Sequence, residues 1–171
     1  RLSSGKRINT AADDAAGQAI SGRMESQIRG LNMNIRNAKD GQSLVDTMEG
    51  ALQEVSGILQ RMRELAVQAS SGIGSAADRG YLDTEMEALV LEVDAISVNT
   101  KFNEQVLFTG ATFSFFADIN ITGTEIITTA LGMETSTLNV EATDVGIGTV
   151  ANAADAIVDI DNALSAVDQK R

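Results

Sequence analysis

The chain has 171 residues, 43% of them apolar and 22% charged, and its formal net charge is −11. It has no Cys and no His, which excludes disulfides, thiolate zinc sites and catalysis by a Ser-His-Asp triad. A surface this acidic repels nucleic acid, and no apolar run reaches the roughly 18 residues that a membrane-spanning helix needs. We therefore expect a protein that is not an enzyme, binds no cofactor or nucleic acid and does not insert into a membrane.

The charge is unevenly distributed along the chain. Residues 1–63 hold nine basic and seven acidic residues, whereas residues 64–171 hold four and 17. A near-neutral half next to an acidic half favours head-to-tail contacts between copies of the chain.

Apolar residues recur at helical spacing over residues 12–70, and TAAD at 10–13 fits a capping box at the start of this stretch. In its first part the recurring residues are Ile20, Met24, Ile28, Leu31, Ile35 and Ala38. In its second part they alternate three and four residues apart, a heptad pattern typical of helices that pack lengthwise. We call this second run the apolar seam of the helix: Val45, Met48, Leu52, Val55, Leu59, Met62, Ala66 and Ala69.

A phase slip near Gly41 separates the two parts and leaves two interpretations open. The helix breaks there, or it continues for roughly 85–90 Å at about 1.5 Å per residue. Interior glycines each cost about 0.5–1 kcal/mol relative to alanine, so a continuous helix predicts close approach of another backbone at these positions.

A second helix is predicted over residues 75–99, and it opens with the capping box Ser75-Ala-Ala-Asp78. The short connection predicts that it packs antiparallel to the first helix. Its apolar seam is Leu82, Met86, Leu89, Val93 and Ile96.

Residues 102–150 change character, with more Thr, Ile and Phe, period-two alternation and scattered glycines. They predict a small β-hairpin region with strands at 112–115, 118–122 and 125–129, and a further strand beginning near Leu138 and Val140.

A third helix is predicted over residues 152–171, with Asn152 as its cap and with a seam formed by Ile157, Ile160, Leu164 and Val167. Together the segments predict one mainly α (α+β) domain. It is an elongated, coiled-coil-like bundle of a very long N-terminal helix, an antiparallel second helix and a C-terminal helix, with the hairpin region added.

The remaining polar motifs favour structural roles. Asp13 and Asp14 suit a helix N-terminus, where negative charge is stabilised. The acidic residues between Glu85 and Asp94 lie on a predicted helix without a ligand loop, which favours a solvated face over a calcium site. No metal or catalytic residues are predicted.

Residues 1–20 (RLSSGKRINTAADDAAGQAI) closely resemble the signature of bacterial flagellin. The likeness continues in NAKDG at 37–41, EGAL at 49–52, LQRMRELAVQ at 59–68 and DNALSAVD at 161–168. The resemblance implies an extracellular, self-assembling subunit of the bacterial flagellar filament. It also implies an export chaperone and a filament cap as further partners.

By the same resemblance the chain corresponds to the rod domain without the two terminal arms of the family. Residues 1–12 match a spoke-like segment, and residues 102–150 stand in place of the variable outer domain. One departure concerns residues 102–104, where the family usually has Phe-Asn-Gly and this chain has Phe102-Asn103-Glu104. Losing that glycine puts the usual turn geometry in doubt.

The resemblance further implies recognition by a vertebrate Toll-like receptor, through positions matching Arg61, Leu65 and Glu85. Arg61 and Leu65 are four residues apart and share a helix face. The alternatives from the residues alone are a solvated charge for Arg61 and packing at the edge of the core for Leu65.

Two other functions stay open. One is a flagellin homologue displayed on the cell surface as an adhesin or polysaccharide-binding protein, with Arg29, Arg36 and Lys39 as a basic cluster. The other is the hook–filament junction protein, which usually carries Pro after the paired aspartates. Ala15 follows Asp14 here, which favours flagellin.

Overall fold

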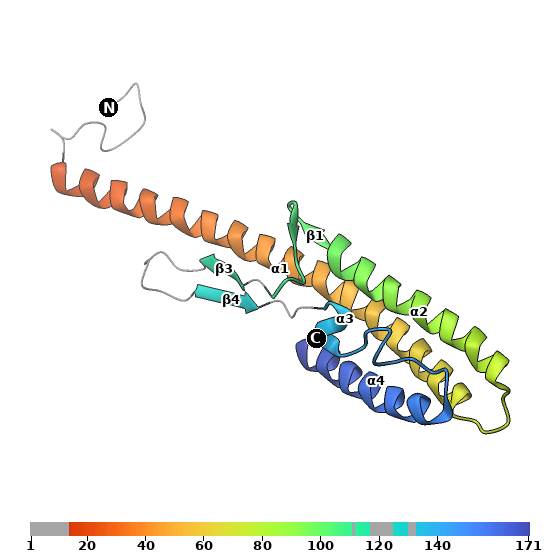
Figure 1. The fold of residues 1–171 in the computed structure, drawn as a ribbon. Coiled ribbons are helices and arrows are strands. Elements are labelled where there is room, and N and C mark those ends of the chain that lie inside the picture. The colour runs from red at the N-terminus through yellow and green to blue at the C-terminus, as the bar shows by residue number, and fades with distance from the viewer. Residues whose placement is uncertain (1–13, 111, 117–124, 130–132) are drawn as a thin grey trace. The chain divides into compact units, whose positions relative to one another are not determined.

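The computed structural model describes residues 14–110, 112–116, 125–129 and 133–171. The chain forms two compact units, Arg1–Gln42 with Ser114–Ile127 and Ser43–Phe113 with Thr128–Arg171. The described residues form four α-helices and four short strands (Figure 1): α1 Ala15–Ala69, α2 Ala76–Asn99, β1 Lys101–Phe102, β2 Gln105–Val106, β3 Thr112–Phe116, β4 Glu125–Thr129, α3 Thr135–Leu138 and α4 Val150–Lys170.

The first helix is continuous through Gly41, so the unbroken interpretation is confirmed and the break is wrong. At its start, the Asp14 carboxylate accepts a hydrogen bond from the Gly17 backbone N–H at 2.9 Å, as expected of a residue that caps a helix. The capping box predicted at residues 10–13 lies outside the described residues.

Gly41 is a point of close approach in the first unit. A Cβ atom placed on Gly41 would lie 3.3 Å from ring carbons of Phe115 in β3, tighter than an ordinary contact. Around Gly22, Gly30, Gly50 and Gly57 a Cβ would meet no atom of the described residues within 4 Å. Among the described residues, close packing therefore accounts for Gly41 and for none of these other four glycines.

The core of the second unit forms where α1 packs against both α2 and α4, which each run antiparallel to it (Figure 1). Ion pairs from Arg63 to Asp161 and from Glu49 to Arg171 join α1 and α4 in this antiparallel register. The buried apolar side chains of α1 are Leu44, Met48, Ala51, Leu52, Val55, Leu59, Met62, Leu65, Ala66 and Ala69.

The seam of α1 is confirmed from Met48 onward but is wrong at Val45. Val45 is 43% exposed, whereas its neighbour Leu44 is 2% exposed. A straight α-helix drifts by about 20° per heptad relative to a strict seven-residue repeat. Val45 lies three heptads before Ala66, so the accumulated drift turns Val45 away from the core. The same drift turns Leu44 towards the core.

The seams of α2 and α4 are confirmed in part. Met86, Val93, Ile160 and Val167 are buried, whereas Leu82, Leu89, Ile96, Ile157 and Leu164 are only half-buried. The small side chains of alanine and serine allow α1 to approach closely and therefore occupy buried positions that a search for large apolar residues misses. The buried residues missed in this way are Ser97, Ala153, Ala156 and Ala163, and Val90 is a further buried residue that the predicted seam of α2 left out.

The described part of residues 101–129 contains two two-stranded sheets, β1–β2 and β3–β4, which confirms a small hairpin region. In the antiparallel β1–β2 hairpin, Lys101 pairs with Val106 and Phe102 pairs with Gln105. Asn103 and Glu104 form its turn with φ angles of 50° and 66°. A left-handed turn is therefore kept although glutamate occupies the usual glycine position.

The strands predicted at 112–115 and 125–129 are confirmed, and the one at 118–122 lies outside the described residues. The strand predicted at Leu138 and Val140 is wrong, because Leu138 ends the short helix α3. Asn139 follows it with a left-handed φ of 59°, a conformation that terminates helices.

Two carboxylates on α2 hold the segment that contains α3 and leads to α4. Asp94 accepts hydrogen bonds from the backbone N–H and the hydroxyl of Thr135, at 3.0 and 2.9 Å. Asp83 accepts one from the Ile147 N–H at 2.7 Å. These bonds fix a segment whose Met133, Leu138, Val140, Val145 and Ile147 side chains are buried.

The helix starts are capped by side chains. Ser75 and Asp78 form the predicted capping box, and the hydrogen bonds from Ser75 lower the pKa of the Asp78 carboxyl below its ordinary value. Helix α4 begins at Val150 rather than 152, because Thr149 and not Asn152 is its cap. Within the described ranges, every helix is too short or too polar to cross a bilayer.

A matched pair of substitutions tests the assigned core. Leu59→Asp places a charge where the side chain is fully buried, and we expect it to destabilise the chain by at least about 3 kcal/mol. Val45→Asp introduces the same side chain at an exposed position and should change stability by less than about 1 kcal/mol. Urea unfolding followed by circular dichroism measures both. Equal losses in the two variants would contradict the core described above.

Candidate protein-interaction surface on α1

The outward face of α1 in the second unit carries charged side chains that reach both neighbouring helices. Arg61 donates to one oxygen of Glu85 on α2 through Nε at 3.1 Å and through its terminal nitrogen at 2.7 Å. It also donates to Glu64 at 3.0 Å. The hydrogen bonds to Glu85 are the main cause of a raised Arg61 pKa.

Arg63 reaches the other way, towards α4. Its Nε donates to Asp161 at 2.6 Å, and this hydrogen bond raises the pKa of Arg63. Both arginines are about half exposed, so each ion pair positions side chains more than it stabilises the fold.

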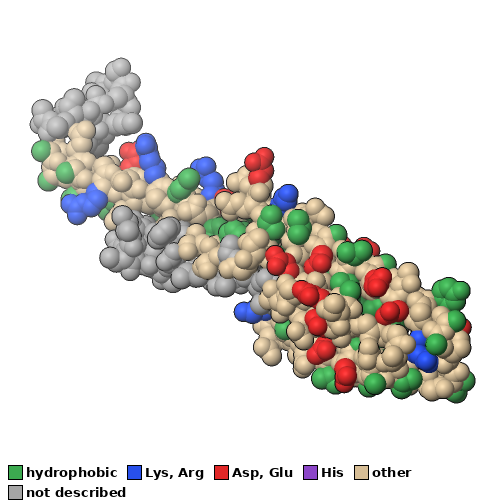
Figure 2. All heavy atoms as spheres, in the orientation of Figure 1, with side chains coloured by type: hydrophobic (Ala, Val, Ile, Leu, Met, Phe, Trp, Pro, Cys, Tyr) green, Lys and Arg blue, Asp and Glu red, His purple; other side chains and the backbone are tan. Residues whose placement is uncertain are grey.

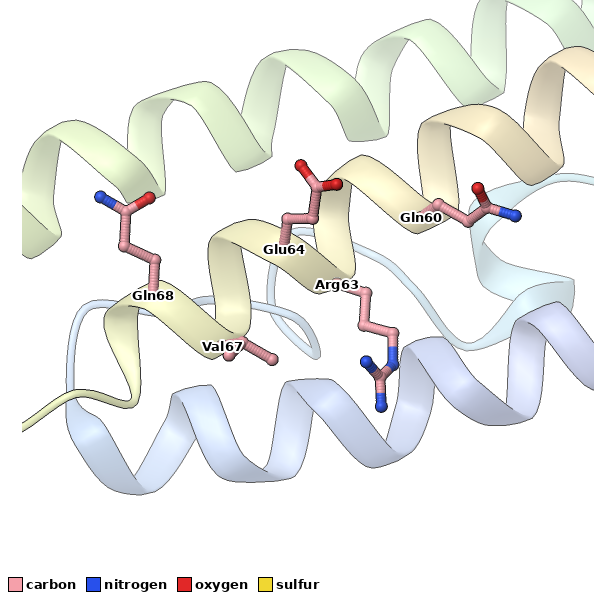
Figure 3. Close-up of a pocket in the computed structure, with 5 residues that line it drawn as sticks. All are labelled: Gln60, Arg63, Glu64, Val67 and Gln68. Atoms are coloured by element: carbon pink, nitrogen blue, oxygen red, sulfur yellow. The ribbon is translucent and has the colours of Figure 1, made fainter.

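A shallow groove of about 480 Å³ lies along this face of α1. Figure 3 shows its lining residues, with Glu64 and Gln68 directed towards α2 and Arg63 towards α4. Val67 lines the groove and is exposed, so the surface combines one apolar side chain with polar and charged ones. The lining is Gln60, Arg63, Glu64, Val67 and Gln68. Such a mixed surface suits binding to another protein.

The structure brings two of the three residues singled out by resemblance together at the surface. Arg61 and Glu85 are exposed and joined by an ion pair, whereas the Leu65 side chain is fully buried. Of the roles considered for Leu65, packing in the core is therefore the one that agrees with its position in the structure. Sequence reasoning missed Glu64 and Asp161 as partners of the arginines. The three-residue spacing of Arg61 and Glu64 could have indicated the first, whereas the second depends on tertiary packing.

The acidic residues of α2 form no site of their own. Glu85 is paired with Arg61, and Asp94 is bonded to Thr135. Within the described ranges, no three acidic side chains converge to hold a metal ion.

A second surface lies on α1 in the first unit, where the recurring apolar residues are half exposed rather than buried. We call Ile20, Met24, Ile28, Leu31 and Ile35 the α1 stripe. On this part of α1 Lys and Arg side chains stand out, whereas acidic side chains dominate the visible face of the second unit (Figure 2).

Residues 1–112 match the family model described as the bacterial flagellin N-terminal helical region. The chain is a member of the flagellin family. Flagellin from Halalkalibacterium halodurans is 44% identical over 98% of the chain, and the flagellar filament 33 kDa core protein of Treponema phagedenis is 41% identical over 94%. The chain spans 58% and 54% of the length of these two flagellin relatives.

Solved structures agree with this family. The crystal structure of Bacillus cereus flagellin aligns with a TM-score of 0.70 and 30% identity, over 80% of this chain and 78% of that one. FliC from Burkholderia pseudomallei aligns with a TM-score of 0.60 over 75% of this chain, and at 19% identity it supports the flagellin fold alone.

Proposed function

We propose that this chain is the helical part of a structural subunit of the bacterial flagellar filament, outside the cell, and that it polymerises with further copies of itself. Two curated relatives that match almost all of it are named as a flagellin and a filament core protein. Their names favour this function over the hook–filament junction protein and over a cell-surface adhesin.

The observation that carries the proposal is the α1 stripe. A monomeric protein rarely exposes a long row of large apolar side chains on one helix, and such rows mark protein–protein contacts. The five side chains recur at helical spacing and are all about half exposed. A neighbouring subunit that covers the α1 stripe would gain roughly 25 cal/mol for each Å² of apolar surface buried.

In this proposal the parts of the chain have separate roles. Residues 1–171 form a single rod-type domain, in which residues 1–12 are a spoke-like segment. The hairpin region takes the place of the variable outer domain of the family. An export chaperone and a filament cap would act on the subunit before and during assembly.

Polymerisation of the gene product that carries this chain tests the function. With filament seeds, the parent protein should form filaments visible by electron microscopy. Ile28→Asp should abolish assembly without lowering the melting temperature, because this side chain is already exposed. Val158→Asp, at an exposed position on α4, serves as the control and should assemble. A parent that never polymerises, or an Ile28→Asp variant that assembles normally, would refute the proposal.

We also propose that the outward face of α1 is recognised by a Toll-like receptor of the host. Arg61 and Glu85 are exposed side by side and offer both charges to a partner, and Leu65 would hold α1 in position from within the core. The neighbouring groove adds Val67 and polar side chains.

The receptor proposal is tested by the paired substitution Arg61→Glu with Glu85→Arg. Exchanging the charges keeps the ion pair between residues 61 and 85 and loses only the exposed pair between Arg61 and Glu64, so the melting temperature should change little, whereas the charges presented to a partner are reversed. We expect binding to the receptor ectodomain to weaken about tenfold or more. Arg29→Glu, on an exposed part of α1 outside this face, is the control. Unchanged affinity of the exchanged variant would contradict receptor binding through this pair.

A further inference from the structure

The outward face of α1 in the second unit carries a row of exposed positions that α2 and α4 leave open. These positions alternate three and four residues apart, and we call them the outer row of α1: Gly50, Gln53, Gly57, Gln60, Glu64 and Val67. Helix α4 already runs along this stretch of α1, with Asp161 beside Arg63 and Arg171 beside Glu49. The exposure of the outer row of α1 therefore does not depend on the length of α4.

Two glycines of this row have no role in the packing of the described residues. A Cβ atom on Gly50 or Gly57 would meet no described atom within 4 Å. Glycine inside a helix is destabilising relative to alanine, so the fold of the second unit gives no reason for a glycine at either position. At a helix surface, glycine allows another helix to approach closely, because no side chain separates the two backbones.

The second helix carries a row of the same spacing on the side that faces away from the core. Its core side packs through the buried residues Met86, Val90 and Val93. On the opposite side, at 100° per residue, lies the outer row of α2, in which every residue is exposed: Tyr81, Thr84, Ala88, Leu91, Ala95 and Val98. Leu91 is 69% exposed, and large apolar side chains exposed along one helix mark a protein contact.

The two outer rows are complementary in size when the helices pack antiparallel. Both rows extend over about 26 Å of helix with the same order of steps, so each position of one row lies opposite a position of the other. In four of these pairs a large side chain faces a small one or a glycine: Leu91 and Gly57, Val98 and Gly50, Gln60 and Ala88, Gln53 and Ala95. The other two pairs bring Tyr81 onto Val67 and Thr84 onto Glu64.

The charges beside the two rows are complementary in the same register. At 100° per residue, Arg61 and Arg63 lie on either side of the outer row of α1, and Glu85 and Glu87 lie on either side of the outer row of α2. Antiparallel packing brings Arg63 within about 3 Å of Glu87 along the helix axes, and Arg61 within about 3 Å of Glu85. Both arginines are about half exposed, so each can donate to a second carboxylate besides the one it contacts in its own chain.

We propose that the outer row of α2 in one copy packs antiparallel on the outer row of α1 in a second copy, in the register that places Leu91 over Gly57. The inference rests on the proposed function and specifies which surfaces of two subunits meet. Because the two rows differ, the contact is head-to-tail and can propagate into a polymer rather than close into a dimer.

Cysteine cross-linking tests the contact and its register, because the chain contains no cysteine of its own. Gln60→Cys and Ala88→Cys variants are mixed, polymerised on seeds and oxidised. We expect disulfides that join residue 60 of one copy to residue 88 of another, identified by mass spectrometry. Ala95→Cys in place of Ala88→Cys is the control, since residue 95 lies on the same row but about 10 Å out of register. Filaments in which residue 60 links to residue 88 no more often than to residue 95 would overturn the inference.

An exchange of side-chain size supplies a second readout that does not depend on disulfide geometry. Gly57→Leu fills the position that Leu91 of another copy would cover, so it should slow polymerisation at least tenfold. The melting temperature of the monomer should not fall, because a Cβ at residue 57 meets no described atom. Adding Leu91→Ala to the same chain should recover most of the parent rate. Asn162→Leu, at an exposed position on α4, is the control and should assemble at the parent rate.

Two results would contradict the inference. One is a Gly57→Leu variant that assembles at the parent rate, and the other is a double variant that assembles no faster than Gly57→Leu alone. A parent that does not polymerise refutes the proposed function instead, so the two failures are distinguishable.

Discussion

The packing of one helix between two others supports every other feature of the second unit. From Leu44 to Ala69, α1 is buried on two adjoining sides, because α2 and α4 both run antiparallel along it. Seam residues such as Val55, Leu59 and Met62 are fully buried, and Ala51 and Leu65 widen the buried face beyond a single row. This contact fixes the register of the helices, which in turn brings Arg61 beside Glu85 and Arg63 beside Asp161.

The same helix behaves differently in its first part. Residues 20–35 repeat the apolar spacing of the seam, but their side chains are half exposed. Helical periodicity indicates that one face of a helix is apolar, but it does not indicate which surface covers that face. The function proposed above assigns the covering of this face to other copies of the chain.

Much of the fold follows from local chemistry that the sequence displays. The capping box at Ser75, the helical periods and the turn-rich change of character after residue 101 identify the helices and the hairpin region. The error at Val45 arose because a strict heptad ignores the slow drift of a real α-helix. The inward alanines of α4 were missed because the search favoured large side chains, whereas close helix packing favours small ones.

The remaining differences between the structure predicted from the sequence and the observed structure come from contacts between residues distant in sequence. Nothing near Asp83 or Asp94 indicates that they accept hydrogen bonds from residues 147 and 135. The helix α3 replaced a predicted strand because Asp94 holds its first turn and Asn139 ends it in a left-handed conformation. In the β1–β2 turn, Glu104 adopts a glycine-like φ because strand pairing on both sides fixes the backbone. Likewise, the burial of Leu65 depends on how α2 and α4 flank α1.

Hydrogen exchange along α1 provides the most direct test of the central claim, that one part of this helix is held by its own chain and the other by neighbouring copies. In the unassembled protein, amides of residues 44–69 should exchange only through global unfolding, and amides of residues 20–35 should exchange much faster. After polymerisation the second set should become as protected as the first. Equal protection of both segments before assembly, or no gain at residues 20–35 afterwards, would contradict this account.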